Sequence, residues 1–286
     1  MKKILVTGGN GQLGSELKVI AETTDSCKFT FIDIADLDLT DIDAVTVYFT
    51  KYKFDYIVNC AAYTAVDKAE EEPELASRLN AELPGILARA AKAQGATILH
   101  ISTDFVFEGD QPTPLLEEDK AKPVSVYGKT KLAGEKAIAQ ECQEHFIIRT
   151  SWLYSSFGNN FVKTILRLAE VKEKLGIVYD QVGTPTYARD LAEVIIKIIY
   201  TESTSYGLYH YSNEGVASWY DFALAICDLF ELRTEVSPIL AIEYPLPAKR
   251  PSFSVMNKYR IKQTFDLTIA HWRVSLIACK NDMIAN

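Results

Sequence analysis

The chain has 286 residues, of which 48% are hydrophobic and 24% are charged, and its formal net charge is -8. This composition is typical of a folded globular protein, and the acidic excess argues against nucleic acid or an anionic membrane as a partner. The five cysteines are odd in number and show no metal-ligand spacing, which indicates reduced thiols in a cytoplasmic protein. The four histidines show no paired spacing either, so no metal site is predicted.

The beginning of the chain predicts a strand, a glycine-rich turn and a helix. An apolar run over residues 3–7 is followed by the turn at 8–14 and by a helical pattern over 15–23. Glycines permit a tight turn and a close approach of the backbone to a pyrophosphate, and the helix N-terminus offers free N–H groups. In this order the three elements are typical of a dinucleotide-binding site; an ordinary glycine-rich turn is the alternative.

An acidic residue after the next strand bears on the choice of cofactor. The apolar run over residues 28–32 ends at Asp33. A carboxylate at this place accepts hydrogen bonds from a ribose 2′-hydroxyl and repels a 2′-phosphate, so Asp33 favours NADH over NADPH. Asp36, Asp38 and Asp41 lie close by and are alternatives for this carboxylate.

The next segments continue the alternation of helix and strand. We expect a helix over residues 38–52 with Thr40 as its N-cap, a strand over 54–60, and one long helix through Asn80 to Gln94. The small residues that end the strand would let a dinucleotide lie against the backbone. Asn80 is expected on the neutral surface of the long helix.

Two further motifs predict acid–base chemistry. A strand over residues 95–101 ends in Ser102-Thr103-Asp104, and Tyr127 and Lys131 lie four residues apart where a helix begins. This spacing places both side chains on one face of the helix, where the ammonium would lower the pKa of the tyrosine and make it a proton donor. A hydroxyl at the strand end would hold a carbonyl oxygen. The alternatives are a solvated helix face and a capping turn.

Strands and helices alternate through the second half as well. Strands are expected over residues 146–152, 176–181 and 206–211, and helices over 159–169, 189–200 and 218–232. No low-complexity linker separates this half from the first. The strands after residue 175 are therefore expected to return to the first sheet.

The motifs together resemble the extended short-chain dehydrogenase/reductase family. The resemblance rests on Gly-Gly-x-Gly-x-x-Gly at residues 8–14, Ser-Thr-Asp-x-Val-Phe at 102–107 and Tyr-Gly-Lys-Thr-Lys at 127–131. Finer matches are similar to the dTDP-4-dehydrorhamnose reductases within it. These matches lie at residues 62–70, 127–136, 149–152, 158–161 and 250–251.

The resemblance implies an α/β fold, with a Rossmann-type doubly wound parallel sheet and a smaller, interleaved α/β substrate-binding lobe. Residues 1–150 would form the dinucleotide-binding domain, with later segments near 176–211 returning to it. Residues 151–286 would form mainly the substrate lobe. Some relatives pair through acidic residues that hold magnesium, so a homodimer is one expected state. Only Glu16 matches such a residue, and no metal is predicted.

The activity implied is the NAD(P)H-dependent reduction of the C4 ketone of dTDP-4-dehydro-β-L-rhamnose to dTDP-L-rhamnose. Tyr127 would donate the proton, Lys131 would lower the pKa of the tyrosine, and Thr103 would hold the carbonyl oxygen. The expected cofactor-binding residues are Gly8, Asn10, Gly11, Gln12, Leu13, Asp33, Asp38, Leu39, Ala61, Ala62, Tyr63, Tyr127 and Lys131. The expected substrate-binding residues are Thr103, Asp104, Trp152, Asn160 and Arg250, the last as a planar donor fork for the diphosphate.

Two other functions remain as alternatives. One is a nucleotide-sugar epimerase or dehydratase of the same family, although dehydratases use an acidic pair and residues 102–104 contain a single carboxylate. The other is a non-catalytic regulatory relative. The retention of Thr103, Tyr127 and Lys131 argues against that reading.

Overall fold

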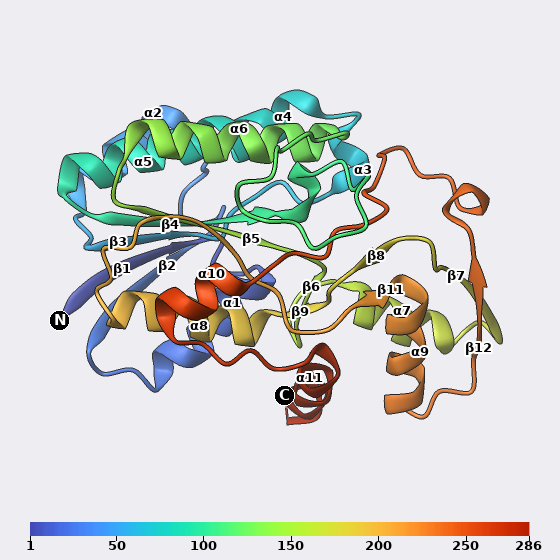
Figure 1. The fold of residues 1–286 in the computed structure, drawn as a ribbon. Coiled ribbons are helices and arrows are strands. Elements are labelled where there is room, and N and C mark those ends of the chain that lie inside the picture. Colours follow the sequence, from blue (N-terminus) through green and yellow to red (C-terminus); the bar gives the residue numbers. More distant parts are fainter. Residues whose placement is uncertain (286) are drawn as a thin grey trace.

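The main sheet carries the fold, and the computed structural model describes it within residues 1–285. Its six strands run in the order β10-β5-β4-β3-β1-β2, and all neighbouring pairs are parallel (Figure 1). The strands are β1 (Lys2–Thr7), β2 (Cys27–Ile32), β3 (Tyr56–Asn59), β4 (Thr97–Thr103), β5 (His145–Thr150) and β10 (Gly207–His210). The strand order reverses beside β1, which creates the crevice where such sheets bind ligands. The predicted Rossmann-type fold is confirmed.

Helices cover both faces of this sheet, as Figure 1 shows. On one face lie α2 (Ile42–Lys51), α5 (Leu83–Gln94) and α6 (Val126–Glu141); on the other lie α1 (Gln12–Glu22), α8 (Ala188–Tyr200) and α10 (Tyr259–Phe265). Strand β1 therefore carries an unbroken apolar run, because both of its faces are buried. Ile4, Leu5 and Val6 are all fully buried.

The N-cap of α2 differs from the sequence prediction. Asp41 caps the helix, with its carboxylate accepting a hydrogen bond from the Ala44 backbone N–H at 2.9 Å. The Thr40 hydroxyl instead donates to Asp38 at 2.7 Å. Both residue types suit an N-cap, so the pattern alone did not distinguish neighbouring candidates.

The long helix expected before residue 94 is broken into four pieces. These are α3 (Val66–Ala69), α4 (Pro73–Ser77), the π-helical turn η1 (Arg78–Glu82) and α5. The expectation of a surface Asn80 was wrong, because this residue lies fully buried in the π turn. Its amide accepts from the Tyr63 N–H at 2.9 Å and donates to the Tyr63 carbonyl at 3.0 Å. Turns of this kind are frequent at functional sites, and here one fixes the loop that follows β3.

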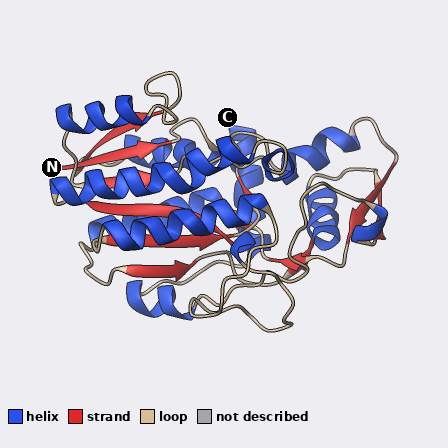
Figure 2. Cartoon of the chain, turned by 90° about the horizontal axis from the view of Figure 1, so that it is seen from above, coloured by secondary structure: helices blue, strands red, loops and turns tan. Residues whose placement is uncertain are grey.

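The second lobe lies beyond the carboxyl ends of the main strands (Figure 2). It contains α7 (Phe161–Ala169), β7 (Lys174–Val178), α9 (Trp219–Leu229), β12 (Glu235–Ile239) and α11 (Trp272–Ala285), with the short strands β6 (Leu153–Tyr154), β8 (Val182–Gly183), β9 (Thr186–Tyr187) and β11 (Ala217–Ser218). The strand expected near residue 176 is β7, and it pairs with β12 rather than with the main sheet. In contrast, α8 and β10 do lie with that sheet. Within residues 1–285, no helix has the length and apolar character needed to cross a membrane.

Candidate active site

A cleft of about 890 Å³ opens at the carboxyl ends of the main strands. Its walls come from the glycine-rich turn, the ends of β3, β4 and β5, the start of α6 and the second lobe. All five predicted substrate residues line it, as do all the predicted cofactor residues except Tyr63. Segments far apart in the sequence are thus brought to one place.

The glycine-rich turn forms one end of the cleft. Gly8 has a positive φ of 66°, and a Cβ there would lie 2.8 Å from the Ala61 backbone nitrogen. A Cβ on Gly14 would lie 2.3 Å from the Gly8 carbonyl oxygen. The N-cap of α1 is Gly11, which has no capping side chain, so the first N–H groups of the helix are free to receive an anion. This backbone fits the pyrophosphate of a dinucleotide.

Two of the four candidate aspartates line the cleft beside this turn. The Asp33 carboxylate accepts from the backbone N–H groups of Asn10 and Ile34, both at 2.8 Å. The Asp38 carboxylate accepts from the backbone and hydroxyl of Thr40, and these bonds lower its pKa. Both carboxylates are therefore held in place at the cleft wall.

Tyr63 is the one predicted cofactor residue that does not line the cleft. Its hydroxyl donates to the Glu72 carboxylate, and its backbone is held by Asn80. The neighbours Ala61, Ala62 and Thr64 line the cleft instead. The sequence located the right loop, but the side chain of Tyr63 has a partner elsewhere.

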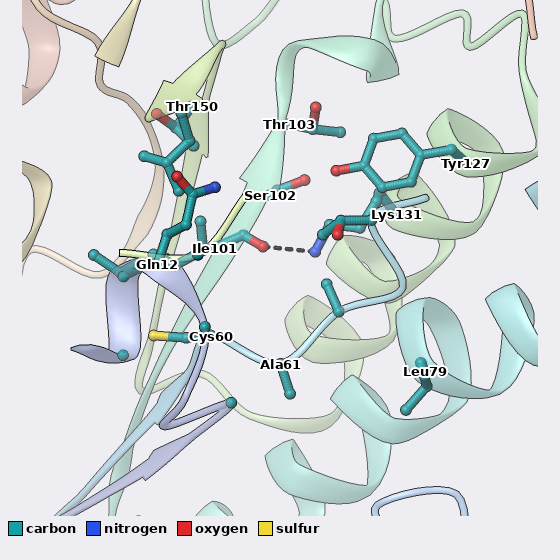
Figure 3. A pocket seen from close by; sticks show the side chains of 18 of the residues that line it. Gln12, Cys60, Ala61, Leu79, Ile101, Ser102, Thr103, Tyr127, Lys131 and Thr150 are labelled. Atoms are coloured by element: carbon teal, nitrogen blue, oxygen red, sulfur yellow. Dashed lines mark hydrogen bonds between the residues drawn. The ribbon is translucent and has the colours of Figure 1, made fainter. Parts of the chain in front are cut away.

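The predicted catalytic residues meet across the middle of the cleft. Tyr127 and Lys131 project from the same face of α6, and Thr103 lies beside the Tyr127 hydroxyl at the end of β4 (Figure 3). The Ser125 hydroxyl caps α6 by accepting from the Gly128 N–H at 3.1 Å. A Cβ on Gly128 would lie 2.2 Å from the Phe105 carbonyl oxygen. Glycine therefore lets the start of α6 dock against the segment that follows Thr103.

Burial dominates the acid–base properties of this pair. It raises the pKa of Tyr127 to about 12, although the Thr103 hydroxyl opposes the shift. Burial also lowers the pKa of Lys131 to about 8, opposed by the charges of Glu135 and Cys60. The expectation that the lysine lowers the pKa of the tyrosine was therefore wrong, because burial outweighs the other influences on this hydroxyl. The tyrosine is held in its protonated form, which is the form that donates a proton.

Asp104 is a second titratable group in the cleft. It is 2% exposed, and its Oδ2 has no hydrogen-bond partner within residues 1–285. The other oxygen, Oδ1, accepts from the Thr103 hydroxyl at 3.0 Å. Burial raises the pKa of Asp104 to about 6, and the Ser254 and Thr103 hydroxyls offset this only in part. Asp104 thus places a buried carboxyl group at the cleft wall, beside Thr103.

We expect Asp104→Asn to stabilise the folded chain by about 1–3 kcal/mol at neutral pH, because a rise in pKa of one unit corresponds to roughly 1.4 kcal/mol. The pKa rises from 3.8 to about 6 on folding. The parent chain therefore has its full stability below the unfolded pKa of 3.8. It becomes less stable as the pH rises through the folded pKa of about 6. The advantage of the variant should grow across this window and stay constant above it. Urea unfolding across the window measures this, with Asp25→Asn as an exposed control; a pH-independent difference would contradict it.

A buried ion pair supports the catalytic strand and helix from behind. Arg149 on β5 donates from Nε and Nη2 to the two oxygens of Glu135 on α6, at 2.9 and 2.7 Å. The side chains are 4% and 6% exposed. Ser102 donates its hydroxyl to the same carboxylate. The sequence signal for this pair was weak, since a glutamate four residues after Lys131 suits any helix.

Two stacked tryptophans also line the cleft. Trp152 and Trp219 have ring centroids 3.5 Å apart and planes inclined by 7°. The backbone of Trp152 has a φ of 47°, an uncommon value for a bulky residue. A Cβ on Gly183 would lie 2.7 Å from the Trp152 ring, so glycine makes room for it. Sequence reasoning missed Trp219, because the first residue of an amphipathic helix carries no signal of its own.

The last two predicted substrate residues are held by partners within the chain. The Asn160 amide donates to the Ser155 carbonyl at 2.8 Å and to the Gln12 side chain at 3.1 Å. Arg250 makes two hydrogen bonds with the Asp67 carboxylate, at 2.7 and 3.1 Å. The guanidinium that was expected to bind the diphosphate therefore already has a carboxylate partner within the chain.

Glu16, the residue considered as a metal ligand, has hydrogen-bond partners within the chain. It accepts from Arg189 and from the Ser155 hydroxyl, both at 2.6 Å. Across the described part of the chain, no group of three or more His, Cys, Asp or Glu side chains is arranged to hold a metal ion.

Comparisons with known proteins agree with this geometry. The family model described as the RmlD substrate binding domain matches residues 1–284. The dTDP-4-dehydrorhamnose reductase of Aggregatibacter actinomycetemcomitans is 40% identical, over 96% of this chain and 97% of its own. A crystal structure of a dTDP-4-dehydrorhamnose reductase from Clostridium acetobutylicum has a TM-score of 0.94 and 43% identity, covering 99% of both chains.

A further crystal structure bears on the cofactor. The dTDP-4-dehydrorhamnose reductase of Bacillus anthracis, solved in complex with NADP, has a TM-score of 0.93 and 37% identity, covering 98% of this chain and 99% of its own. In both solved structures the similarity extends over both lobes. The chain therefore belongs to the RmlD family, the dTDP-4-dehydrorhamnose reductases of the extended short-chain dehydrogenase/reductase superfamily.

Proposed function

We propose that this chain reduces the C4 ketone of dTDP-4-dehydro-β-L-rhamnose to dTDP-L-rhamnose, the final step of dTDP-L-rhamnose biosynthesis, and does so in the cytoplasm. The observation that carries this proposal is the meeting of Thr103, Tyr127 and Lys131 in one cleft with a phosphate-binding turn. The membership of the RmlD family supports the choice of substrate. Residues 1–150 would serve mainly the dinucleotide, and residues 151–286 mainly the sugar nucleotide.

The chain provides a fitted place for a nicotinamide dinucleotide, which supplies the hydride when bound. The backbone of Gly8, Gly11 and the first turn of α1 would hold its pyrophosphate. Asp33 and Asp38 would accept hydrogen bonds from ribose hydroxyls. The small side chains of Ala61 and Ala62 leave room for the rest of the dinucleotide at the end of β3. These roles follow from the free N–H groups and the absence of side-chain bulk along this wall.

Tyr127 would donate its proton to the C4 oxygen as negative charge develops there. Thr103, whose side chain lies beside the Tyr127 hydroxyl, would hold the same oxygen, a polarising contact that contributes a few kcal/mol, roughly 2.7–4 for one removed donor. Lys131 would stabilise the phenolate that remains. A tyrosine kept protonated by burial suits reduction better than oxidation, since the reverse reaction begins from a phenolate.

The second lobe and the strand ends would hold the sugar nucleotide. Asp104 would accept from a sugar hydroxyl, and Trp152 offers a broad apolar face. Asn160 and Arg250 would contact the nucleotide part of the substrate. The guanidinium would bind the diphosphate either in place of the Asp67 carboxylate or together with it. Arginine suits this exchange, because its planar fork binds carboxylate and phosphate oxygens in the same way.

The assay follows the loss of reduced nicotinamide absorbance when dTDP-4-dehydro-L-rhamnose is added with NADH or NADPH. We expect oxidation of the cofactor, with NADH favoured because of the Asp33 carboxylate. Asp33→Asn keeps the hydrogen bond from Asn10 but removes the charge, and should raise the preference for NADPH about tenfold, which corresponds to roughly 1.4 kcal/mol. Asp25→Asn is the exposed control.

Absence of oxidation with either cofactor, in a folded chain that binds dinucleotide, would contradict the proposed reduction. Interconversion of nucleotide sugars without net oxidation would favour an epimerase. A preference for NADPH that Asp33→Asn leaves unchanged would contradict the assignment of Asp33.

A further inference from the structure

A lysine of α1 reaches the end of the cleft where Asp33 and the glycine-rich turn meet. Side chains of a helix lean toward its N-terminus, so Lys18 points back toward the residues that precede α1. Its ammonium donates to Asn10 Oδ1 at 2.7 Å. Asn10 itself lines the cleft. A positive charge is thus placed one side chain away from the cleft wall.

The aromatic ring of Phe31 supports the lysine side chain in this direction. Phe31 lies on β2, and Lys18 Nζ is 5.6 Å from the centroid of its ring, a separation at which a cation is attracted to an aromatic face. A Cβ on Gly9 would lie 3.1 Å from the Phe31 Cβ, so the turn packs closely against the same residue. Lys18 is half-buried at this place. Its direction therefore does not depend on the contact with Asn10 alone.

The contact with Asn10 leaves the charge of the lysine available to a ligand. An ammonium only donates, so the amide presents its oxygen to Lys18 and keeps its amino group, with two N–H donors, for other partners. Because the partner is a neutral amide, this bond does not neutralise the positive charge. The Asn10 backbone N–H donates in turn to the Asp33 carboxylate at 2.8 Å. One residue thus contacts the cation through its side chain and the anion through its backbone.

Asp33 and Lys18 would act in opposite directions on one group of a dinucleotide. A carboxylate at the end of β2 suits a ribose 2′-hydroxyl and repels a 2′-phosphate, whereas a nearby basic side chain accommodates that phosphate. Lysine binds phosphate as a point charge and does not need the fixed fork of a guanidinium. Within residues 1–285, the cations that line the cleft are Lys131 on α6 and Arg250 after β12. Neither belongs to the turn, which Lys18 contacts directly.

We propose that Lys18 is a specificity-determining residue, which with the amino group of Asn10 receives the 2′-phosphate of NADP and offsets the repulsion from Asp33. This inference rests on the dinucleotide site of the proposed function and refines it. The Asp33 carboxylate favours NAD, and Lys18 makes that preference smaller than the carboxylate alone would. The balance between the two dinucleotides is then set by two side chains of opposite charge.

Binding of the oxidised dinucleotides, measured by isothermal titration calorimetry, tests this role without turnover. NAD⁺ and NADP⁺ differ only in the 2′-phosphate, so the ratio of their dissociation constants isolates its contribution. Lys18→Met removes the charge and keeps most of the stem beside Phe31. It should weaken NADP⁺ binding about fivefold or more, as expected for one charge pair near solvent, and change NAD⁺ binding less than about twofold. Lys18→Arg keeps the charge and should keep the parental ratio.

The matched control is Lys28→Met, which removes an exposed lysine from β2 and should leave both affinities as in the parent. If Lys18 only supports the turn, Lys18→Met should weaken NAD⁺ and NADP⁺ equally, and that result overturns the proposal. An unchanged NADP⁺ affinity overturns it as well. Since salt screens charges near the surface, the difference between the parent and Lys18→Met should shrink as the ionic strength rises from about 0.05 to about 0.5 M. A difference that salt leaves unchanged also contradicts the role.

These results can be separated from those of the reductase assay. A chain that binds NADP⁺ through Lys18 but does not reduce dTDP-4-dehydro-L-rhamnose contradicts the proposed function and supports the role of Lys18. Reduction of the ketone, together with equal NADP⁺ affinities of the parent and Lys18→Met, does the reverse. Binding of neither dinucleotide contradicts both.

Discussion

Replacing Tyr127 by phenylalanine should lower kcat for ketone reduction by about 10²- to 10⁴-fold, the usual contribution of a positioned proton donor. The substitution removes one oxygen and leaves the ring, whose edge-on contact with Phe105 has a centroid distance of 5.4 Å. Folding and dinucleotide affinity should therefore change little. Stopped-flow absorbance of reduced nicotinamide measures the rate, and fluorescence titration measures the affinity.

The control for this substitution is Tyr52→Phe, which removes a hydroxyl from an exposed residue after α2. It should react at the parental rate. A Tyr127→Phe variant that keeps the parental kcat would show that the proton comes from another group. Equal losses in kcat and in dinucleotide affinity would instead indicate a structural role for the hydroxyl.

The largest effects on stability should come from the ion pair behind the catalytic residues. Removing one member, in Glu135→Leu or Arg149→Met, leaves the other charge buried without its partner. We expect the free energy of unfolding to fall by about 3–5 kcal/mol in each case. The double variant leaves no unpaired charge and should lose far less than the sum of the two, because two apolar side chains of similar volume replace the pair. Urea unfolding of the four proteins measures this cycle.

An exposed ion pair between two helices of the same face is the matched control. Arg89 on α5 and Glu141 on α6 lie 2.8 Å apart, but their side chains are 56% and 32% exposed. Glu141→Gln should cost no more than about 1 kcal/mol, since solvent screens such pairs. If the single substitutions at Glu135 and Arg149 also lower the free energy of unfolding by no more than about 1 kcal/mol, the expected cost of leaving one buried charge unpaired is contradicted.

The parts of the site that could be predicted from the sequence are those with a local signal. The turn at residues 8–14 is identified by glycines whose spacing has a direct steric meaning, as Gly14 shows. The spacing of Tyr127 and Lys131 is fixed by helix geometry, and the alternation of apolar runs indicated a parallel sheet. Such signals lie within one element and its neighbours.

The rest depends on contacts between distant segments. Asn80 looks like any helical asparagine until the loop containing Tyr63 is placed beside it. β7 has an ordinary strand pattern, and nothing in that pattern distinguishes β12 from the main sheet as its partner. The pKa of Tyr127 was misjudged for a related reason: charge separation can be estimated from spacing, whereas burial is a property of the whole fold.

The order in which the sheet is covered has a consequence for synthesis on the ribosome. One face is closed by α2, α5 and α6, which all precede residue 142, but the other face also needs α8 and α10, which end only at residues 200 and 265. β10, at the edge of the sheet, also emerges after residue 206. A nascent chain of the first 150 residues would therefore expose apolar side chains on one side of the sheet, together with an unpaired strand edge. Both are features that promote aggregation before folding is complete.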